Sequence, residues 1–442
     1  MLYILLFLLL LLLFICNFES RYNFICPAFI FCAVFCFNIV WAIYRAKDWK
    51  FEIGGITFCV IFFGILIFLV CCYIVKKFFA KVSTHNNFSC ISYIYISRWK
   101  ICVLIFFQSL TIFLTLYFII VLYSSNWGQL SQAIWLYKYN YTSENGIFKS
   151  IPGYVAYMRT ITDAMGYYTG YILINNRIIS KKTDRLLFLS FVLSVLSGIT
   201  TGSRGWALNL IIGAGVTFFL LKGKKEGRLL RLSPKLLFKI ILIFVLLLIS
   251  YQSIGTLLGA DTSSIKFMDY ISMYCGGSIY NLDYFIKNIN WPKSNVFGGQ
   301  TFIYIIKWIG PLFGIDTNYR LDMPFIRNGV YEMGNIYTTF YPFIYDFGLA
   351  GTFFLTALMA IITQSIYEKT KFSFESSKPA FSIILYSYVF SSIMFSFFSN
   401  KFYESVFTPN FLVYIISWKI IEIFFFRVTK NNRVNKTVNY VK

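Results

Sequence analysis

The stretch LSGITTGSRGWALNLIIG (196–213) joins two apolar segments through a short polar turn that carries Arg204. Apolar segments of around 20 residues recur on both sides of it, and each is long enough to cross a hydrocarbon layer of about 30 Å. The chain of 442 residues is 58% hydrophobic and only 13% charged, against about 25% charged residues in soluble domains. These features predict an all-α, polytopic integral membrane protein, because a membrane β-barrel has short alternating segments instead.

The apolar runs on either side of this turn predict about 11 membrane-spanning helices, within a range of about 10–12. We expect them to form one membrane domain over 1–442. The first run has neither a basic leader nor a small-residue cleavage site, so it is predicted to be a retained helix. The predicted spans are 2–17, 24–44, 53–75, 101–123, 154–176, 186–201, 205–221, 236–256, 338–366, 380–399 and 407–426.

Lysine and arginine residues set the predicted orientation, because cytoplasmic loops are enriched in them. The densest basic loop is KGKKEGRLLRLSPK (222–235), which we place in the cytoplasm. The other loops predicted to be cytoplasmic are 76–87, 176–185 and the basic tail 427–442. The loops predicted to lie outside are 124–153, 202–204, 257–337 and 400–406. The loop 45–52 disagrees, because it would lie outside although it is basic; either its two acids weaken the signal or the first helices are miscounted.

The segment 257–337 is the only long hydrophilic stretch, and we expect a large periplasmic loop there. Loops of this length are usually functional or disordered. It contains aromatic sequences that are typical of turns, such as GGSIYNLDYF (276–285) and NWPKSNVFGGQ (290–300). Its apolar part, 298–315, is interrupted by Lys307 and Pro311, which indicates an interfacial or re-entrant helix rather than a full span.

The net charge of +22 does not indicate nucleic-acid binding, because the basic residues lie between hydrophobic segments. The ten cysteines are scattered without a CxxC pair, and His85 is the only histidine. A zinc site or a Cys/His nucleophile pair is therefore not expected, and no acid cluster has the spacing of a metal site.

Arg204 is the first candidate functional residue in the sequence. Gly202 and Gly205 allow a sharp turn, and Gly205 begins the next helix, whose free N–H groups point to the same place. A helix N-terminus beside a guanidinium group is well suited to a phosphate. The alternative is that Arg204 anchors the helix end to lipid headgroups.

Two further positions place charge inside predicted spans, where it is costly and tends to be functional. Arg159 and Asp163 are four residues apart and share one helix face, so they are either functional or a self-neutralising pair. Asp346 has no basic residue near it in the sequence. We expect its carboxylate to find an arginine, a lysine or water elsewhere in the fold, with Arg204 and Arg159 as candidates, and the pair could be purely structural.

The segment NYRLDMPFIRNGVYEMGN (318–335) holds four more charged candidates, namely Arg320, Asp322, Arg327 and Glu332. Arginines could bind a diphosphate, and a carboxylate could accept a proton from a hydroxyl group. The alternative is a solvated loop with surface ion pairs, which contribute little to stability.

The turn TGSRG (201–205), the long outer segment and the stretch GNIYTTFYPFIYDFGLAGTFFL (334–355) together resemble the Wzy-type O-antigen polymerases of bacteria. The resemblance covers most of 100–400 as a layout, and its specific motifs are short. It implies a GT-C-like fold in the bacterial inner (cytoplasmic) membrane with a cytoplasmic C-terminus. It also implies transfer of a growing glycan from undecaprenyl diphosphate to the terminal sugar of an incoming undecaprenyl-diphosphate-linked repeat unit, at the periplasmic face.

An enzyme of this family is a glycosyltransferase of lipopolysaccharide synthesis that uses no nucleotide sugar, and we expect no metal or other cofactor. Its implied partners are the lipid-linked oligosaccharide, the bilayer, a chain-length regulator and a flippase, without nucleic acid. Fixed cations would stabilise the departing diphosphate, and the candidates for binding it are Arg204, Arg159, Arg320 and Arg327, together with Gly205 at the start of a helix. A carboxylate would act as base, and the candidates in falling order of preference are Asp346, Asp322, Glu332 and Asp163.

Three other functions remain open at this point. A flippase or transporter of lipid-linked sugars would also need a cationic cavity, but one spread over several helices in the middle of the membrane. An O-antigen ligase would use the same donor, but such ligases usually carry a histidine in an outer loop, and His85 is predicted to be cytoplasmic. A non-catalytic scaffold would leave the long outer segment unexplained.

Overall fold

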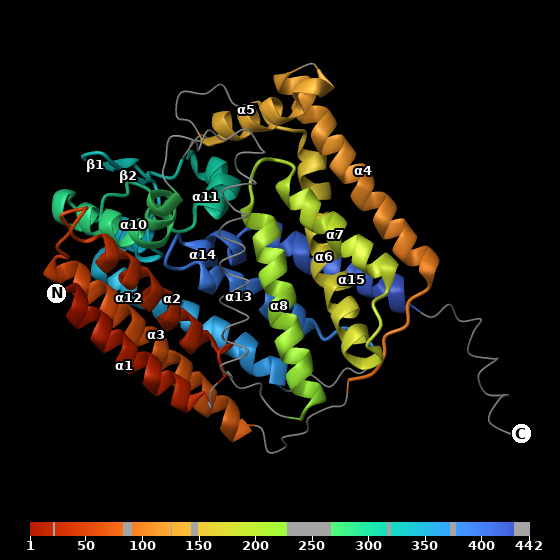
Figure 1. Cartoon of the computed structure of the whole chain (residues 1–442), viewed down its shortest axis with the longest axis horizontal. Coiled ribbons are helices and arrows are strands. Elements are labelled where there is room, and N and C mark those ends of the chain that lie inside the picture. The colour runs from red at the N-terminus through yellow and green to blue at the C-terminus, as the bar shows by residue number, and fades with distance from the viewer. Residues whose placement is uncertain are drawn as a thin grey trace, which may run out of the picture.

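Residues 1–20, 23–82, 91–124, 126–142, 149–227, 267–315, 320–371 and 377–427 are described by the computed structural model of the chain (Figure 1). Within these ranges the protein is helical apart from one two-stranded hairpin. One group of packed helices contains α1 (Leu2–Glu19), α2 (Pro27–Arg45), α3 (Gly55–Val82) and α12 (Phe340–Lys371). A second contains α4 (Arg98–Tyr123), α6 (Gly153–Ser180), α7 (Arg185–Ile199), α8 (Gly205–Lys225) and α15 (Pro409–Phe426). Helix α13 (Phe381–Met394) packs against both α12 and α8 and so joins the two groups.

The described part of the chain has 7 helices that are long and apolar enough to cross a membrane, which are α1, α2, α3, α4, α8, α12 and α15. This confirms the predicted all-α fold with several membrane-length helices. Two other predicted spans form shorter apolar helices, α7 of 15 residues and α13 of 14 residues. Helix α6 has 28 residues but carries many polar side chains. The predicted span 236–256 lies outside the described residues.

Buried polar side chains and aromatic rings hold the helices together. Gln108 of α4 donates a hydrogen bond of 2.9 Å to Ser194 of α7, and the Ser194 hydroxyl donates one of 2.7 Å to the carbonyl of Thr162 in α6. In the first group, the rings of Phe31 and Phe68 stack with centroids 4.0 Å apart. Small hydroxyl residues let membrane helices approach closely and bond to one another, where lipid supplies no hydrophobic driving force between helices.

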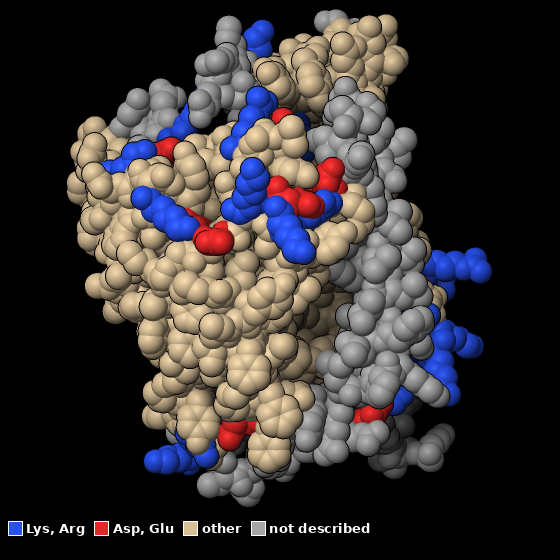
Figure 2. Space-filling view, turned by 60° about the vertical axis from the view of Figure 1, so that its left-hand side comes forward, with Lys and Arg blue, Asp and Glu red and all other residues tan. Residues whose placement is uncertain are grey.

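The contacts between loops divide the bundle into two ends. We define the upper end by the segments 45–54, 126–142, 149–159, 200–204, 267–315, 320–346 and 395–408. Arg45 pairs with Asp269 at 2.6 Å, and the amide of Asn400 donates to the carbonyl of Thr301 at 3.1 Å. The lower end holds 76–82, 91–100, 176–185 and 222–227, where for example Ile94 and Asn176 are hydrogen-bonded. Figure 2 shows charged side chains gathered toward both ends, with a wide uncharged band between them on the described surface in that view.

The loop 45–52, whose charge opposed the predicted orientation, lies at the upper end beside 267–337. Asn328 donates a hydrogen bond of 2.6 Å to the carbonyl of Trp49, and Lys287 donates one of 2.7 Å to the carbonyl of Glu52. Arg45 forms ion pairs with Asp48 and Asp269. The loop therefore shares an end with the other segments predicted to face outside, and nearby acids neutralise part of its positive charge.

The sequence GGSIYNLDYF, predicted to form turns in a long loop, instead lies inside helix α10 (Phe267–Asn288). Its glycines serve close packing: a Cβ at Gly276 would lie 2.9 Å from the backbone nitrogen of Ala42 in α2. Asn38 of α2 also donates to the hydroxyl of Ser278 at 3.1 Å. The prediction of turns was wrong because glycine marks both turns and close helix contacts.

The rest of the upper end consists of short elements. Strands β1 (Ile326–Asn328) and β2 (Tyr331–Gly334) form an antiparallel hairpin. The stretch 298–315 contains helix α11 (Ile303–Ile309), followed by the 3₁₀ turn η2 (Gly310–Phe313). Helix α5 (Leu130–Thr142), preceded by η1 (Trp127–Gln129), packs beside α4, and α14 (Lys401–Val406) lies between α13 and α15. These elements cap the bundle at one end (Figure 1).

Helix α12 bends at Gly348, whose backbone angles are φ 65° and ψ −158°. Only glycine adopts this region readily, because any side chain would be strained there. The bend directs the first part of α12 against the segment 291–302. The N–H of Lys293 donates to the carbonyl of Tyr345 at 2.7 Å. The start of α12 thus forms a wall of the upper end.

Candidate functional site

Arg204 and Arg159 lie close to the turn between α7 and α8 at the upper end. Arg204 occupies the position before α8 and is only 8% exposed. One terminal nitrogen of its guanidinium lies 3.5 Å from the hydroxyl of Tyr270 in α10. Arg159 of α6 donates a hydrogen bond of 3.0 Å to the hydroxyl of Thr201, and its Nε atom is buried without a hydrogen-bond partner. Two cations from different helices are therefore held on either side of one turn.

Lys138 of α5 adds a third cation. Its side chain packs against the turn, since a Cβ at Gly202 would lie 3.2 Å from its Cβ and Cδ atoms. Burial lowers the pKa of Lys138, and the positive charge of Arg204 lowers it further. We call Lys138, Arg159 and Arg204 the basic group. Burial disfavours these positive charges, and Lys138 and Arg204 also repel each other, so an anion beside them would be stabilised.

Gly205 is the first residue of α8, and a Cβ there would meet nothing within 4 Å. The backbone at the start of α8 therefore borders open space next to Arg204. The first N–H groups of a helix have no partner inside the helix and attract negative charge. This geometry suits the diphosphate-binding role predicted for Gly205.

Asp163 lies on the same helix as Arg159, but the two side chains do not form an ion pair. One carboxylate oxygen of Asp163 accepts a hydrogen bond from the hydroxyl of Tyr414 in α15, and its Oδ1 atom is buried without a hydrogen-bond partner. Arg159 and Asp163 nevertheless attract each other electrostatically, although no direct ion pair joins them. Their interpretation as a self-neutralising pair therefore holds as an attraction between charges and not as a hydrogen-bonded contact.

Asp346 accepts three hydrogen bonds from backbone N–H groups. Both of its oxygens lie 3.1 Å from the nitrogen of Gln300, and Oδ2 lies 2.6 Å from the nitrogen of Thr301. The predicted arginine or lysine partner, with Arg204 and Arg159 as candidates, is not found for Asp346 among the described residues. The carboxylate links the turn before α11 to the start of α12. A carboxylate that accepts hydrogen bonds from backbone N–H groups is stabilised in its ionised form without a cation beside it.

Asp322 also lies against the start of α12. Its Oδ2 atom accepts hydrogen bonds of 2.6 Å from Lys293 and from the hydroxyl of Tyr345. Burial alone would raise the pKa of Asp322, but the hydrogen bonds from Lys293 and Tyr345 lower it below its ordinary value. The side chain of Gln300 accepts a bond from the N–H of Asp322 at 2.8 Å and donates one to the carbonyl of Arg320 at 3.2 Å. Asp322 is thus an ionised carboxylate in a fixed position.

The other charged candidates of 318–335 are more exposed. Arg327 and Glu332 face each other across the hairpin at 3.3 Å, with side chains 72% and 45% exposed. Arg320 is exposed. Burial of Lys307 lowers the pKa of that side chain, and the nearby positive charge of Arg320 lowers it further. The geometry of Arg327 and Glu332 is that of a surface ion pair, whereas Arg320 and Lys307 form a second positive area.

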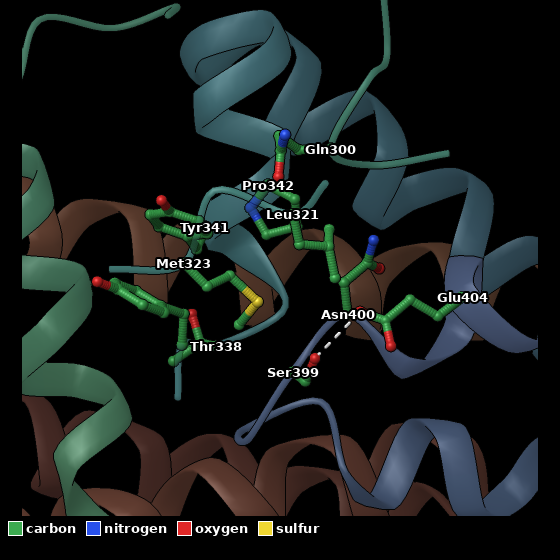
Figure 3. Close-up of a pocket in the computed structure, with 10 residues that line it drawn as sticks. Gln300, Leu321, Met323, Thr338, Tyr341, Pro342, Ser399, Asn400 and Glu404 are labelled. Carbon is green, nitrogen blue, oxygen red and sulfur yellow. Dashed lines mark hydrogen bonds between the residues drawn. The ribbon is translucent and has the colours of Figure 1, made fainter. Parts of the chain in front are cut away.

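A small pocket lies between the start of α12, the residues Gln300, Leu321 and Met323, and the turn before α14 (Figure 3). The residues that line it are Gln300, Leu321, Met323, Tyr337, Thr338, Tyr341, Pro342, Ser399, Asn400 and Glu404. Glu404 is the only charged side chain among them. Its Oε1 atom accepts a hydrogen bond of 3.2 Å from Ser399, and its Oε2 atom lies 2.6 Å from Lys401. Glu404 was not among the functional residues predicted from the sequence, although an acid in the polar turn 400–406 between two apolar segments could have indicated one.

An aromatic path connects this pocket with the basic group. The ring of Tyr270, whose hydroxyl lies beside Arg204, is 4.9 Å from that of Tyr274. The ring of Tyr274 stacks on Phe398 at 5.8 Å, and Phe398 directly precedes Ser399 of the pocket. The upper end therefore holds a cationic site and a small pocket that are linked by these ring contacts and by the chain from Phe398 to Ser399.

Comparison of the chain with protein-family models, with curated proteins and with solved structures found no match.

Proposed function

We propose that the chain is a membrane glycosyltransferase that polymerises the oligosaccharide repeat units of a surface polysaccharide. It transfers the growing glycan from undecaprenyl diphosphate to the terminal sugar of an incoming repeat unit, which is carried on a second undecaprenyl diphosphate. The observation that carries the proposal is the basic group, which gathers Lys138, Arg159 and Arg204 from three parts of the sequence at one end of a membrane-length bundle.

The basic group suits the leaving group of this reaction. When the sugar–phosphate bond breaks, negative charge develops on the diphosphate, and fixed cations in a partly water-excluded site stabilise that charge. The unpartnered Nε atom of Arg159 and the forked guanidinium of Arg204 can each donate to phosphate oxygens. The open space before Gly205 and the N-terminus of α8 supply room for the phosphates and further donors.

The distribution of charge supports the proposed orientation. The lower end carries the basic segments 76–82, 98–100, 177–185 and 222–226, and cytoplasmic loops are rich in lysine and arginine. The upper end, with α10 and the hairpin, would then face the periplasm of a bacterial inner membrane, and the tail after α15 would be cytoplasmic. A helical bundle with its site at the outer surface and a cap of short elements is the GT-C-like arrangement that we propose.

The carboxylates of the upper end differ in what they can do. Asp346 is occupied by backbone N–H groups, Glu332 pairs with Arg327 at the surface, and Asp163 lies inside the bundle. Asp322 remains ionised and points toward Tyr345 and Lys293, so it can hold a sugar hydroxyl by accepting a hydrogen bond.

A transfer assay tests this function. The purified protein in liposomes would receive a chemically defined lipid-linked repeat unit, and the products would be separated by length. The proposal expects glycans of two or more repeats together with free undecaprenyl diphosphate, and their loss in the Arg204→Ala variant. A flippase would move the lipid across the bilayer without forming a glycosidic bond, and a ligase would make no polymer from this substrate alone, so either result would contradict the proposal.

A further inference from the structure

We propose that the pocket at the start of α12 receives the attacking hydroxyl group of the acceptor sugar, and that Glu404 removes its proton. This inference rests on the proposed function, because it assigns the acceptor side of the same transfer reaction. The arguments come from the size of the pocket, its polar atoms and the surroundings of its one carboxylate.

The pocket has the size of a single hydroxyl group. The volume open to the centre of a water molecule is about 10 Å³, which is room for about one water. A whole sugar ring does not fit, so the ring must stay at the mouth while one hydroxyl enters. Apolar side chains (Leu321, Met323 and Pro342) supply most of the open surface, hydroxyl and amide groups line the rest, and the ring of Tyr341 lies on one side (Figure 3).

One buried atom in the pocket lacks a partner that a hydroxyl group could supply. Asn400 is only 2% exposed, and its Nδ2 atom donates to the carbonyl of Thr301. Its Oδ1 atom is buried and accepts no hydrogen bond. A buried acceptor without a donor is unfavourable, and the one hydroxyl group that enters the pocket, or a water in its place, could donate to this atom.

Glu404 is the carboxylate placed to act on that hydroxyl. Its side chain is only 8% exposed, and Ser399 and Lys401 fix its orientation. Asp346 does not line the pocket, and its oxygens accept hydrogen bonds from the backbone N–H groups of Gln300 and Thr301. A general base must lie within hydrogen-bonding distance of the proton it removes, and Glu404 is the acid that borders the pocket.

The proposed transfer step accounts for each bond and for the proton. The oxygen of the acceptor hydroxyl attacks the anomeric carbon of the donor glycan and forms the new glycosidic bond. The bond from that carbon to the diphosphate oxygen breaks, and its electron pair leaves with the diphosphate, which the basic group holds. The hydroxyl proton passes to the carboxylate of Glu404 and is later released to water.

The test uses the full-length protein in liposomes with the same lipid-linked repeat unit and compares four variants with the wild type. Glu404→Gln keeps the size and one acceptor oxygen but removes the base, and we expect transfer to fall about 10²–10⁴-fold while binding of undecaprenyl diphosphate is unchanged. Leu321→Phe fills the pocket from its apolar side and should also reduce transfer without affecting donor binding. Glu52→Gln makes the same chemical change at an exposed position of this end and should behave as the wild type.

Lys401→Gln separates catalysis from packing, because it breaks the ion pair at 2.6 Å but keeps the carboxylate. We expect it to lose much less activity than Glu404→Gln. Equal losses in the two variants would overturn the assignment, since the ion pair alone would then explain them. Wild-type transfer rates in Glu404→Gln and Leu321→Phe would also overturn it and would show that the pocket holds only structural water. A wild-type protein without any transfer would instead overturn the proposed function and this assignment with it.

Discussion

The bend at Gly348 predicts that alanine at this position destabilises the protein by an amount that the backbone angles set. At φ 65° and ψ −158°, an alanine would be held in a region that side chains disfavour, at a cost of about 1–3 kcal/mol. Space is not the limit, because a Cβ at Gly348 would lie 3.8 Å or more from its nearest neighbours, the side chains of Trp291 and Pro292. We therefore expect Gly348→Ala to lower the free energy of unfolding by about 1–3 kcal/mol through backbone strain alone.

Gly215 in the middle of α8 is a matched control. A Cβ there meets nothing within 4 Å, and its backbone is helical. Alanine is favoured over glycine inside a helix by about 0.5–1 kcal/mol, so Gly215→Ala should raise stability. Denaturant unfolding of both variants in detergent, followed by tryptophan fluorescence, measures the two effects. If Gly348→Ala proved as stable as the wild type, or gained as much as Gly215→Ala, the strained bend would be refuted.

Three further predictions follow from the upper end. Asp346→Ala should cost about 1–3 kcal/mol for each buried N–H group left without an acceptor, whereas Asp346→Asn, which keeps one acceptor oxygen, should cost less; equal effects in unfolding experiments would contradict an anchoring role. Because the pKa of Asp322 is lowered in the folded protein, the ionised carboxylate stabilises the fold above about pH 4 and this contribution is lost as the pH falls further. The wild type should therefore melt higher than Asp322→Asn at pH 6, with a gap that closes toward pH 3, and a gap that widened on acidification would contradict the sign. Arg327→Ala should change stability by less than about 1 kcal/mol, because its pair with Glu332 is exposed, and a large loss would show that the hairpin pair is structural.

The sequence predicted most of the helices because their apolar runs are long and separated by polar turns. The limits of α4 and α15 differ from the predicted spans by no more than three residues. Helix α10 was missed for a physical reason: it packs on protein rather than on lipid, so it needs no continuous apolar run. Buried polar residues such as Ser278, Asn281 and Asp283 interrupt its apolar sequence, and its glycine pair at 276–277 imitates a turn.

The candidate site was predictable only in part. The turn that holds Arg204 could be read from the sequence, because its glycines and the following apolar run are local features. The contacts of Arg204 with Tyr270 and Lys138 join α8 to α10 and α5, and such long-range contacts leave no local pattern. For the same reason, the sequence could not show that Asp346 binds backbone N–H groups or that Glu404 borders a pocket.

The most direct test of the account measures how tightly the purified protein binds undecaprenyl diphosphate. If the basic group holds the diphosphate, Arg204→Ala and Arg159→Ala should each weaken binding at least about tenfold, which corresponds to about 1.4 kcal/mol. Arg327→Ala removes an exposed arginine from the same end and should bind as the wild type. Equal affinities for all four proteins would contradict the claim that buried cations at the upper end recognise the lipid diphosphate.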